Sequence, residues 1–442
     1  MMSLSSDAVP IRHIPLSYSH EESRKSALRL ILTLRPDWED TQDLIEFVRF
    51  KEGITNTLLK AIHKEPGKSE EDIDNEAILL RAYGNGTAVL IDRDGETLSH
   101  SLLASHNLAP SLLARFENGL LYKYIQGTAC APEDLRRPEV WRGVARRIAE
   151  WHATLPVTKI TSPPPSTDAP TGRPKPLATL DDAPPPKPGT RHNRTPSVVT
   201  GKPEPTVWSV MQKWIAAVPT STPEEKSRQA TLSKELVWLA RTLGDTPGIH
   251  SAPLVFAHCD LLSGNVIISP PSQSTPTPSR RSSHSSASST PTPQVTTVSF
   301  IDYEYTTAAP AAFDLANHFA EWGGFECDYA VLPTRSQRRD FLKEYLRAYN
   351  THLARAPSEH ETEGELRRLE EEVDMFRGVP GFYWGIWALI QATISQIHFD
   401  YAAYAEVRLG EYWAWKREEG VDVVEGEGES RHRLRERRWR EE

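Results

Sequence analysis

The chain has 442 residues, 25% of them charged, and a formal net charge of −9 at pH 7. This acidic balance, without a basic stripe, argues against nucleic acid as a partner. The three cysteines, Cys130, Cys259 and Cys327, are too few and too scattered for a disulfide framework or a metal-ligand pattern, which favours a reducing compartment. The first residues contain no apolar signal segment and no run of 18 apolar residues occurs, so we expect a cytoplasmic protein without membrane insertion.

Two long stretches are dominated by Pro, Ser and Thr, at 156–205 and 270–297. Such a composition cannot bury a hydrophobic core, so both stretches are expected to be insertions. The remaining sequence fits one two-lobed enzyme. The expected organisation is an N-terminal lead at 1–36, a nucleotide-binding N-lobe at 37–128, a C-lobe at 129–422 that carries both insertions, and a charged tail at 423–442.

The first elements in chain order are short. Residues 1–36 are expected to be irregular, with some strand character in ALRLILTL at 27–34. Asp37–Glu46 predicts a short helix, because acidic residues suit a helix N-terminus. The alternating runs of FVRFKEGITNTLLKAIH predict a β-hairpin with Gly53 at its turn. The hairpin tip could cover the phosphates of a nucleotide, although most glycine turns bind nothing.

A strand-like run, Glu76–Gly84, places Arg81 among apolar neighbours. A buried arginine requires an anionic partner, and Glu96 at the start of the next helical segment is the candidate. The alternative is a surface arginine and an unrelated glutamate. The run ENGLLYKYIQG then predicts a strand that ends in a linker, Lys123–Thr128, which would join the lobes and present backbone groups to adenine.

The central stretch begins with LVFAHCDLLSGNVII, in which His258, Asp260 and Asn265 follow the pattern H-x-D-x-x-x-x-N. After the second insertion, VSFIDYEY carries Asp302 and Glu304. Phosphoryl transfer from ATP needs a carboxylate to orient the attacking hydroxyl and oxygen ligands for Mg²⁺. Asp260 suits the first role, and Asn265 and Asp302 suit the second if Val266–Ile268 and Val298–Ile301 pair as a hairpin. Each residue alone is more typical of a loop cap or turn.

Further polar and aromatic residues follow this stretch. Asp314, Asn317–His318 and Glu321 are spaced to share a helix face, where Asp314 either braces the catalytic loop or contacts substrate. Glu321 stands beside Trp322, and a carboxylate with an aromatic ring can hold an organic ammonium. Trp384 and Trp387 lie three apart in a helical pattern, which by itself is typical of core. The last 18 residues, EGEGESRHRLRERRWREE, predict a solvated charged tail or helix.

Six blocks of this sequence, in order, resemble the choline/ethanolamine kinase family, and ethanolamine kinases in particular: KEGITNTL, LLRAYGNGTAVLIDRDGE, NGLLYKYIQG, FAHCDLLSGNVI, FIDYEYTTAAPAAFDLANHFAEW and FYWGIWALIQATISQIHFDYAAYA. The resemblance implies an α+β, protein-kinase-like bilobal fold with a small β-rich N-lobe and a larger, mainly helical C-lobe. It also implies ATP, Mg²⁺ and transfer of the γ-phosphoryl group to the ethanolamine hydroxyl. That reaction is the first step of the CDP-ethanolamine route to phosphatidylethanolamine.

Carried over residue by residue, the resemblance makes Asp260 the catalytic base, in a catalytic loop with His258 and Asn265, and makes Asn265 and Asp302 the Mg²⁺ ligands. It assigns the nucleotide contacts to Gly53, Thr55, Asn56, Arg81 with its brace Glu96, Lys123, Tyr124 and Ile125. It assigns the amine pocket to Tyr305, Glu321, Trp384 and Trp387. The family usually has Asn where Cys259 stands, and an effect of Cys259 on turnover is left open. Both low-complexity insertions also lack counterparts in compact members.

Ethanolamine and choline are harder to separate. A quaternary ammonium is held by aromatic faces and charge, whereas a primary ammonium also donates hydrogen bonds to acceptors. Three stretches resemble ethanolamine kinases: Leu261–Leu262, IDYEY and ECDYAVLP. Ethanolamine is therefore the expected substrate. The alternatives are a choline kinase, a kinase with dual specificity, or another small-molecule kinase of the same fold, such as an aminoglycoside kinase. A pseudokinase scaffold that recruits partners through its insertions is the hypothesis from another class, and the retained Asp260, Asn265 and Asp302 argue against it.

Overall fold

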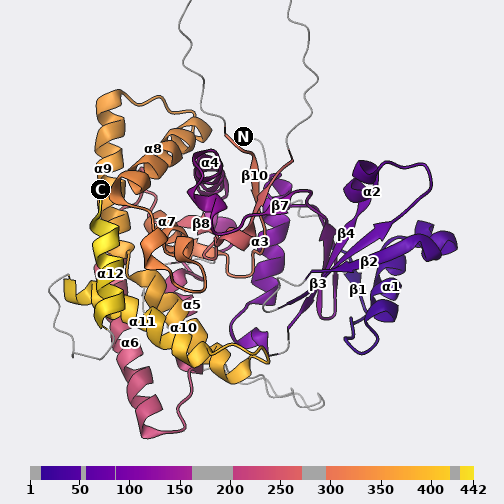
Figure 1. Ribbon diagram of the computed structural model, residues 1–442, viewed down its shortest axis with the longest axis horizontal. Coiled ribbons are helices and arrows are strands. Elements are labelled where there is room, and N and C mark those ends of the chain that lie inside the picture. The colour runs from indigo at the N-terminus through magenta and orange to yellow at the C-terminus, as the bar shows by residue number, and fades with distance from the viewer. Residues whose placement is uncertain (1–10, 51–55, 85, 162–202, 271–294, 419–428) are drawn as a thin grey trace, which may run out of the picture.

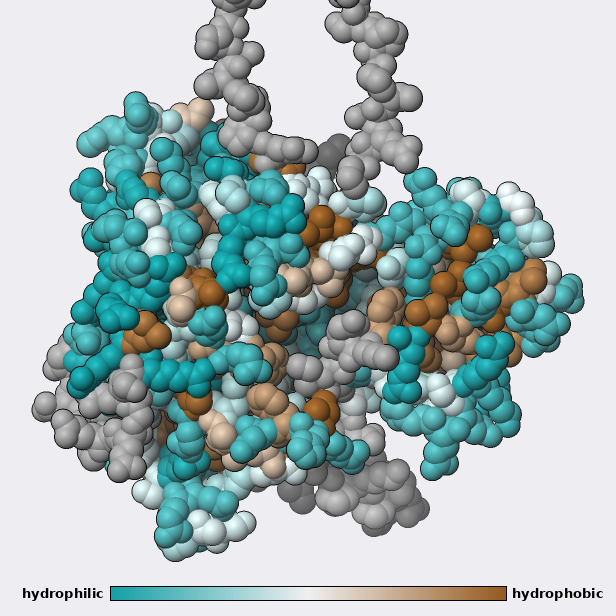
Figure 2. Space-filling view, in the orientation of Figure 1, coloured by the Kyte–Doolittle hydropathy of each residue, from teal (hydrophilic) through white to brown (hydrophobic). Residues whose placement is uncertain are grey.

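The computed structural model describes residues 11–50, 56–84, 86–161, 203–270, 295–418 and 429–442. Figure 1 shows a small sheet-rich lobe beside a larger helical lobe, with α3 (Arg93–Ser105) at their junction. The expected α+β bilobal architecture is confirmed. None of the helices in these ranges is both long and apolar enough to cross a membrane. On the face shown in Figure 2, hydrophilic residues cover most of the surface and hydrophobic residues form separate groups.

The N-lobe is built on one six-stranded sheet in the order β1-β5-β6-β4-β3-β2. All neighbouring strands are antiparallel except β1 and β5. Alternating apolar residues give this sheet one face that packs on a separate small core, which includes Leu80, Phe116 and Leu121. The strands are β1 (His13–Ile14), β2 (Ile45–Arg49), β3 (Asn56–His63), β4 (Ile78–Tyr83), β5 (Leu112–Phe116) and β6 (Gly119–Lys123).

The predicted β-hairpin is confirmed by the pairing of β2 with β3, which runs from Ile45 opposite His63 to Arg49 opposite Leu59. Its tip, including Gly53 and Thr55, lies outside the described residues. The neighbouring segment, Pro36–Leu44, is a 3₁₀ helix rather than an α-helix. A short α-helix, α2 (Glu70–Glu76), connects β3 to β4 and begins at the capping residue Ser69.

The expected strand character at 27–34 is wrong, because Ser23–Leu34 forms helix α1. Its buried positions include Ala27, Leu30 and Ile31, which are spaced as one face of a helix. The run ALRLILTL is apolar at nearly every position, so its sequence alone did not separate a buried strand from a helix. Packing on the N-lobe core selects the helix.

The C-lobe surrounds the catalytic stretch with helices and two small sheets. Four helices, α5, α6, α8 and α9, begin with a capping box, in which the first and fourth residues satisfy each other's backbone N–H groups. The helices are α4 (Pro138–Thr154), α5 (Val207–Ala217), α6 (Pro223–Leu243), α7 (Ala311–Ala320), α8 (Arg335–His352), α9 (Glu359–Phe376), α10 (Val379–Ile394), α11 (Tyr401–Glu418) and α12 (Glu429–Arg440).

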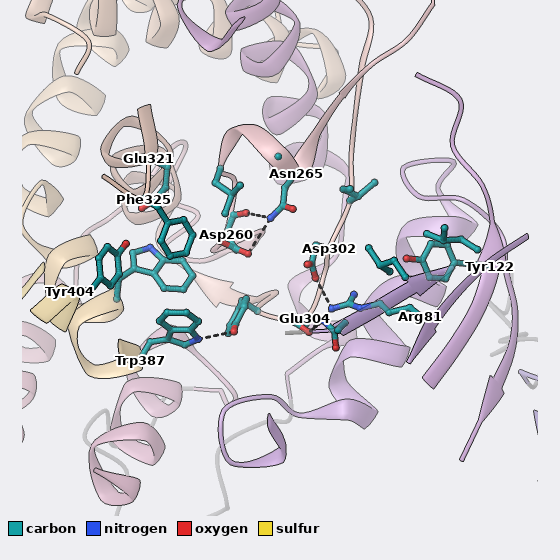
Figure 3. Close-up of a pocket in the computed structure, with 18 residues that line it drawn as sticks. Arg81, Tyr122, Asp260, Asn265, Asp302, Glu304, Glu321, Phe325, Trp387 and Tyr404 are labelled. Carbon is teal, nitrogen blue, oxygen red and sulfur yellow. Dashed lines mark hydrogen bonds and ion pairs between the residues drawn. The ribbon is translucent and has the colours of Figure 1, made fainter. Parts of the chain in front are cut away.

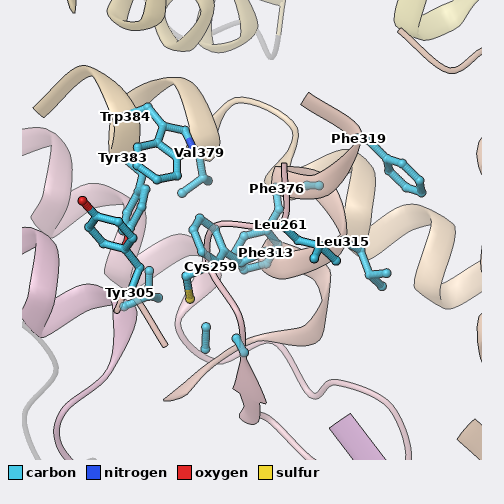
Figure 4. Packing of buried hydrophobic residues seen from close by; sticks show 14 of the residues in the cluster. Cys259, Leu261, Tyr305, Phe313, Leu315, Phe319, Phe376, Val379, Tyr383 and Trp384 are labelled. Carbon is cyan, nitrogen blue, oxygen red and sulfur yellow. The ribbon is translucent and has the colours of Figure 1, made fainter. Parts of the chain in front are cut away.

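The small sheets position the catalytic stretch within this helical lobe. One has the strand order β10-β9-β7, and the other pairs β11 with β8. Figure 4 shows the core behind the stretch, where Cys259 and Leu261 pack with Phe313 of α7 and Tyr383 of α10. The strands are β7 (Thr128–Ala129), β8 (Val255–Ala257), β9 (Val266–Ile268), β10 (Val298–Phe300) and β11 (Thr307–Ala309).

The C-terminal charged segment forms a helix, α12, but the expectation that it is solvated is wrong for one face. Arg435, Glu436 and Trp439 are each at most 2% exposed. The Trp439 indole N–H donates to Asp374 on α9 at 2.7 Å, and the Arg338 guanidinium lies over its ring. The helix is therefore part of the C-lobe.

Candidate active site

A cavity of about 280 Å³ opens between the two lobes. Nine residues predicted for the site line it: Asn56, Arg81, Asp260, Asn265, Asp302, Tyr305, Glu321, Trp384 and Trp387. In Figure 3, Arg81 lies at the N-lobe end, Asp260, Asn265 and Asp302 lie in the middle, and Glu321 and Trp387 lie at the other end. We call this last part, with Tyr305 and Trp384, the amine end of the cavity.

The predicted hairpin brings the middle residues together. Strands β9 and β10 are antiparallel, with Val266 opposite Phe300, and the Ile301 N–H donates to the Asn265 carbonyl at 3.0 Å. Asp302 follows directly and has a φ of 66°, a left-handed conformation that is uncommon outside glycine. Backbone strain of this kind clusters at functional sites.

Asp260 faces the cavity and is held by Asn265. The Asn265 side-chain Nδ2 donates to the Asp260 carbonyl at 2.7 Å and to its Oδ2 at 3.1 Å. Burial raises the pKa of Asp260 well above its usual range, and the negative charges of Asp302 and Glu321 add to the rise. A carboxylate in such surroundings takes up a proton readily, as a general base must.

Helix α7 braces the catalytic loop through Asp314. Its Oδ1 accepts the Cys259 N–H at 2.7 Å, and its Oδ2 accepts the His258 N–H at 2.9 Å. Asn317 completes the clamp by donating to the Cys259 carbonyl at 2.9 Å. Burial alone would raise the pKa of Asp314, but its hydrogen bonds and charge interactions with His152 and His258 together hold the pKa below its usual value. Asp314 therefore supports the loop and lies outside the cavity lining.

His258 was predicted in the catalytic set, but the structure does not place it among the residues that line the cavity. Its side chain is buried and stacks on Trp151 at 5.3 Å. Burial lowers the pKa of His258 to about 4, so the ring is neutral. Its Nε2 donates to the Ile301 carbonyl at 3.1 Å, and its Nδ1 accepts the Asp260 N–H at 3.3 Å. The ring thus connects the catalytic loop to the segment after β10 that carries Asp302, which is a positioning role.

The N-lobe end of the cavity contains a network of buried charges around Arg81. Its Nη1 lies 3.1 Å from Glu96 Oε1, as predicted, and its Nη2 lies 2.8 Å from Asp302 Oδ1 and also contacts Glu304. Arg93 pairs with Glu96 at 2.9 Å and with Glu304 at 3.1 Å. Burial raises the pKa of Asp302 to about 7, although Arg81 opposes the rise.

Three of the predicted nucleotide contacts lie elsewhere. Lys123, Tyr124 and Ile125 of the linker are outside the cavity lining, and Tyr122 lines it instead. The Tyr124 ring lies under the Lys60 ammonium at 3.9 Å. Glu96 also lies outside the lining and acts through Arg81. The adenine contacts of the linker therefore stay predictions.

Aromatic rings and one carboxylate form the amine end. Trp384 and Trp387 pack edge to face at 5.5 Å, and the Trp387 indole N–H donates to the Tyr305 hydroxyl at 2.8 Å. The Trp384 indole N–H donates to Asn317 Oδ1 at 2.9 Å. Glu321 lies at the end of α7, and burial raises its pKa. Rings and a carboxylate around one space suit an organic cation.

Nine further lining residues were not in the predicted set: Leu58, Leu79, Tyr122, Leu262, Gly264, Ile301, Glu304, Phe325 and Tyr404. Glu304 had a signal, because it is the second carboxylate of the run VSFIDYEY, two residues after Asp302. Phe325 and Tyr404 had none, since they reach the amine end only through the packing of α11 against the turn after α7. Their rings stack at 5.4 Å.

The middle of the cavity suits a magnesium ion. Because Asn265 turns its Nδ2 toward Asp260, its Oδ1 is left for a cation, and the Asp302 carboxylate, whose Oδ1 also pairs with Arg81 at 2.8 Å, lines the same cavity. In the ranges that the structure covers, no three His, Cys, Asp or Glu side chains form a metal cage. Mg²⁺ commonly binds through one or two protein oxygens together with substrate phosphates, so this donor set fits it. The two-lobed fold and this site define a protein-kinase-like phosphotransferase.

Comparisons with known proteins agree with this class. The family model described as choline/ethanolamine kinase matches residues 47–413. Ethanolamine kinase 1 of Mus musculus is 30% identical over 408 residues, which cover 90% of this chain and 91% of that protein. Ethanolamine kinase of Drosophila melanogaster is 27% identical, with coverage of 92% and 79%. The solved structure of a Plasmodium vivax ethanolamine kinase has the same fold, with a TM-score of 0.60, 22% identity and 89% coverage of both chains. The chain belongs to the choline/ethanolamine kinase family.

Proposed function

We propose that this protein transfers the γ-phosphoryl group of ATP to the hydroxyl of ethanolamine, forming phosphoethanolamine for phosphatidylethanolamine synthesis. One observation carries the proposal. A single cavity joins the Asp260, Asn265 and Asp302 set to an aromatic end that carries Glu321. Relatives with about 30% identity over most of the chain are ethanolamine kinases. We further propose that residues 37–128 bind the nucleotide and that residues 129–422 carry the catalytic and amine-binding groups.

Each residue has a role that follows from its contacts. Asn265 and Asp302 would hold Mg²⁺, which when bound neutralises charge on the transferring phosphates. Asp260 is fixed at its Oδ2 by Asn265, so its Oδ1 orients the ethanolamine hydroxyl and takes up its proton. Arg81 and Asn56 line the N-lobe end of the cavity, where both also bind Glu304, and we propose that they contact the nucleotide phosphates.

The amine end favours a cation and leaves the choice of amine to experiment. Aromatic faces hold either ammonium, whereas the Glu321 carboxylate accepts hydrogen bonds from a primary ammonium only. We propose ethanolamine as the preferred substrate, with choline as the competitor. Cys130, Cys259 and Cys327 are free and buried, which suits the cytoplasmic location that we propose.

The test is an ADP-release assay with purified protein and Mg-ATP, with ethanolamine and choline in parallel. We expect higher kcat/KM for ethanolamine. Asp260→Asn should lower kcat roughly 10²- to 10⁴-fold, the usual contribution of a general base. Asp302→Ala should abolish turnover with Mg-ATP. Preference for choline would overturn the substrate, and Mg-ATP binding without transfer to either amine would favour a pseudokinase scaffold.

A further inference from the structure

A row of buried charges leads from the amine end of the cavity to the C-terminal helix. We call it the charge row, and it consists of Glu321, Arg408, Glu411, Arg435, Glu436 and Arg377. Glu321 Oε1 lies 3.1 Å from Arg408 Nη2. Glu411 Oε2 lies between two guanidinium groups, 3.5 Å from Arg408 Nε and 3.8 Å from Arg435 Nε. Acidic and basic groups alternate along the whole row.

The row is buried along its full length. Arg408, Glu411 and Arg435 are each 1% exposed, and no member is more than 7% exposed. Beyond Arg435, the Glu436 carboxylate joins α12 to Arg377 at 3.0 Å. Removing charged groups from water costs several kcal/mol per ion, and well-packed apolar residues often stabilise a fold as well as a buried ion pair does. Stability alone is therefore a weak reason for a row of six buried charges that begins at the amine end.

The inner three members set the charge and the orientation of the amine end. Arg408 contacts Oε1 of Glu321, and among the described residues Oε2 has no hydrogen bond, which leaves that oxygen to a cation in the cavity. Arg408 is shared with Glu411, so it neutralises only one of the two carboxylates. Glu411 also lies 3.8 Å from Arg435, and the whole row of three carboxylates and three guanidinium groups is neutral, so loss of the Glu411 charge would leave the row with a net positive charge.

We propose that Arg408 and Glu411 are positioning and specificity-determining residues for the amine, with Arg408 orienting Glu321 and Glu411 keeping the amine end negative. Neither residue lines the cavity, so both act through Glu321. This inference rests on the proposed function. In support, burial raises the pKa of Glu321, Arg408 opposes the rise and Glu411 adds to it, so the charge of Glu411 is felt at Glu321. The Tyr329 hydroxyl and Arg435 of α12 fix Glu411 in place.

Two variants separate charge from orientation. Glu411→Gln removes the negative charge and leaves Arg408 to neutralise Glu321, so the KM for ethanolamine should rise roughly 10- to 100-fold, the range for losing one interaction with a charged group. Arg408→Lys keeps the charge but loses the planar fork that reaches both carboxylates. It should raise the KM for ethanolamine more than that for choline, because only a primary ammonium depends on a directed hydrogen bond to Glu321.

The experiment measures kcat and KM for ethanolamine, choline and ATP with the full chain. The matched control is Glu406→Gln on the same helix, where Glu406 pairs with Arg228 at 2.9 Å and both side chains are about half exposed. The control should behave as wild type. For Glu411→Gln, kcat and the KM for ATP should also stay at the wild-type values. The effect should disappear in a Glu321→Gln background, because Glu411 acts through Glu321.

Three results would overturn the inference: a Glu411→Gln enzyme that matches the control, a parallel change in every kinetic constant of both variants, or an unchanged Glu411 effect in the Glu321→Gln background. If Glu411→Gln does not fold, Arg408→Lys carries the test through its ethanolamine to choline ratio. A wild-type enzyme that is silent with ethanolamine would refute the proposed function and this inference together. Wild-type activity with an inert Glu411→Gln substitution would refute the inference alone.

Discussion

Replacing Arg81 with methionine should destabilise the protein strongly, because it leaves buried carboxylates with too little positive charge. The Arg81 side chain is 5% exposed and contacts Glu96, Asp302 and Glu304. Without it, Arg93 is the cation that still pairs with Glu96 and Glu304, whose side chains are 1% and 2% exposed, and Asn56 adds only a neutral hydrogen bond to Glu304 at 3.1 Å. Removing one partner of a buried ion pair costs about 3–5 kcal/mol, and we expect Arg81→Met to lower the free energy of unfolding by that amount.

A second substitution should recover much of the lost free energy of unfolding. The exposed fractions of the two carboxylate side chains, Asp302 and Glu304, indicate which substitution this is. The Asp302 side chain is 31% exposed, so water can solvate it when Arg81 is absent, whereas Glu304 has no such access. Arg81→Met combined with Glu304→Gln should therefore regain most of the lost free energy. Arg81→Met combined with Asp302→Asn should regain little.

The measurement is a urea titration followed by circular dichroism, in EDTA and without nucleotide, so that no ligand contributes to stability. The control is Arg115→Met in the same lobe, because Arg115 pairs with Asp94 at 2.6 Å but the two side chains are 36% and 85% exposed. Arg115→Met should lower the free energy of unfolding by at most about 1 kcal/mol, which is the usual contribution of an exposed ion pair. Better rescue by Asp302→Asn than by Glu304→Gln would refute this account of the network.

Two further predictions concern the amine end and the pH dependence of stability. Trp387→Phe keeps an aromatic face but loses the hydrogen bond to Tyr305, so the KM for ethanolamine should rise about 3- to 10-fold. Trp387→Leu also removes the aromatic face and should raise this KM further. A lower KM for the leucine variant than for the phenylalanine variant would contradict a role for the ring. His100 is 2% exposed, its Nε2 donates to the Pro110 carbonyl at 2.9 Å, and burial lowers its pKa to about 4. The pKa of His100 in the folded state lies below the unfolded value of about 6.5. The neutral ring therefore contributes its full share to the free energy of unfolding above pH 6.5, and that share decreases as the pH falls to 4. The stability difference between wild type and His100→Phe should shrink by about 1.4 kcal/mol per pH unit in that window, and a difference that is constant with pH would contradict it.

The sequence was informative wherever local pattern and structure coincide. The hairpin of β2 and β3, the strand carrying Arg81 and its pair with Glu96 follow from alternation and from the need of a buried cation for an anion. The approach of Asp302 to Asn265 follows from pairing of β9 with β10 across the second insertion. Long loops add closure entropy only slowly, so the insertion does not prevent that pairing.

The parts that the sequence did not reveal depend on contacts between distant segments. Arg408 pairs with Glu321 across 87 residues, and Tyr404 stacks on Phe325 across a similar distance. Neither pair has a periodic or motif signal, since each exists only because α11 packs beside the turn after α7. The charged C-terminal helix is the same case: its composition indicates solvent exposure, and only its position against α9 and α11 buries Arg435 and Trp439.

Substitutions of Cys259 can show whether the catalytic loop is ordered by its own side chains or by helix α7, which packs against it. The Cys259 φ of 64° lies in the left-handed region, where asparagine, aspartate and histidine are several-fold enriched over other residues with a side chain. Its N–H and carbonyl are both held by α7, through Asp314 and Asn317. The thiol is fully buried, and burial raises its pKa well above the usual range, so no thiolate forms there.

Cys259→Asn should therefore act on stability and leave turnover alone. Relief of left-handed strain is worth roughly 1 kcal/mol, and we expect the free energy of unfolding to rise by up to that amount if the buried amide finds a partner. Cys259→Val, of similar size, should destabilise the protein, because a β-branched residue is an outlier at positive φ. Since Asp314 and Asn317 hold the loop by its backbone in both variants, kcat of the folded enzyme should match wild type. A change in kcat for Cys259→Asn without a change in stability would show that the side chain at position 259 itself orders Asp260.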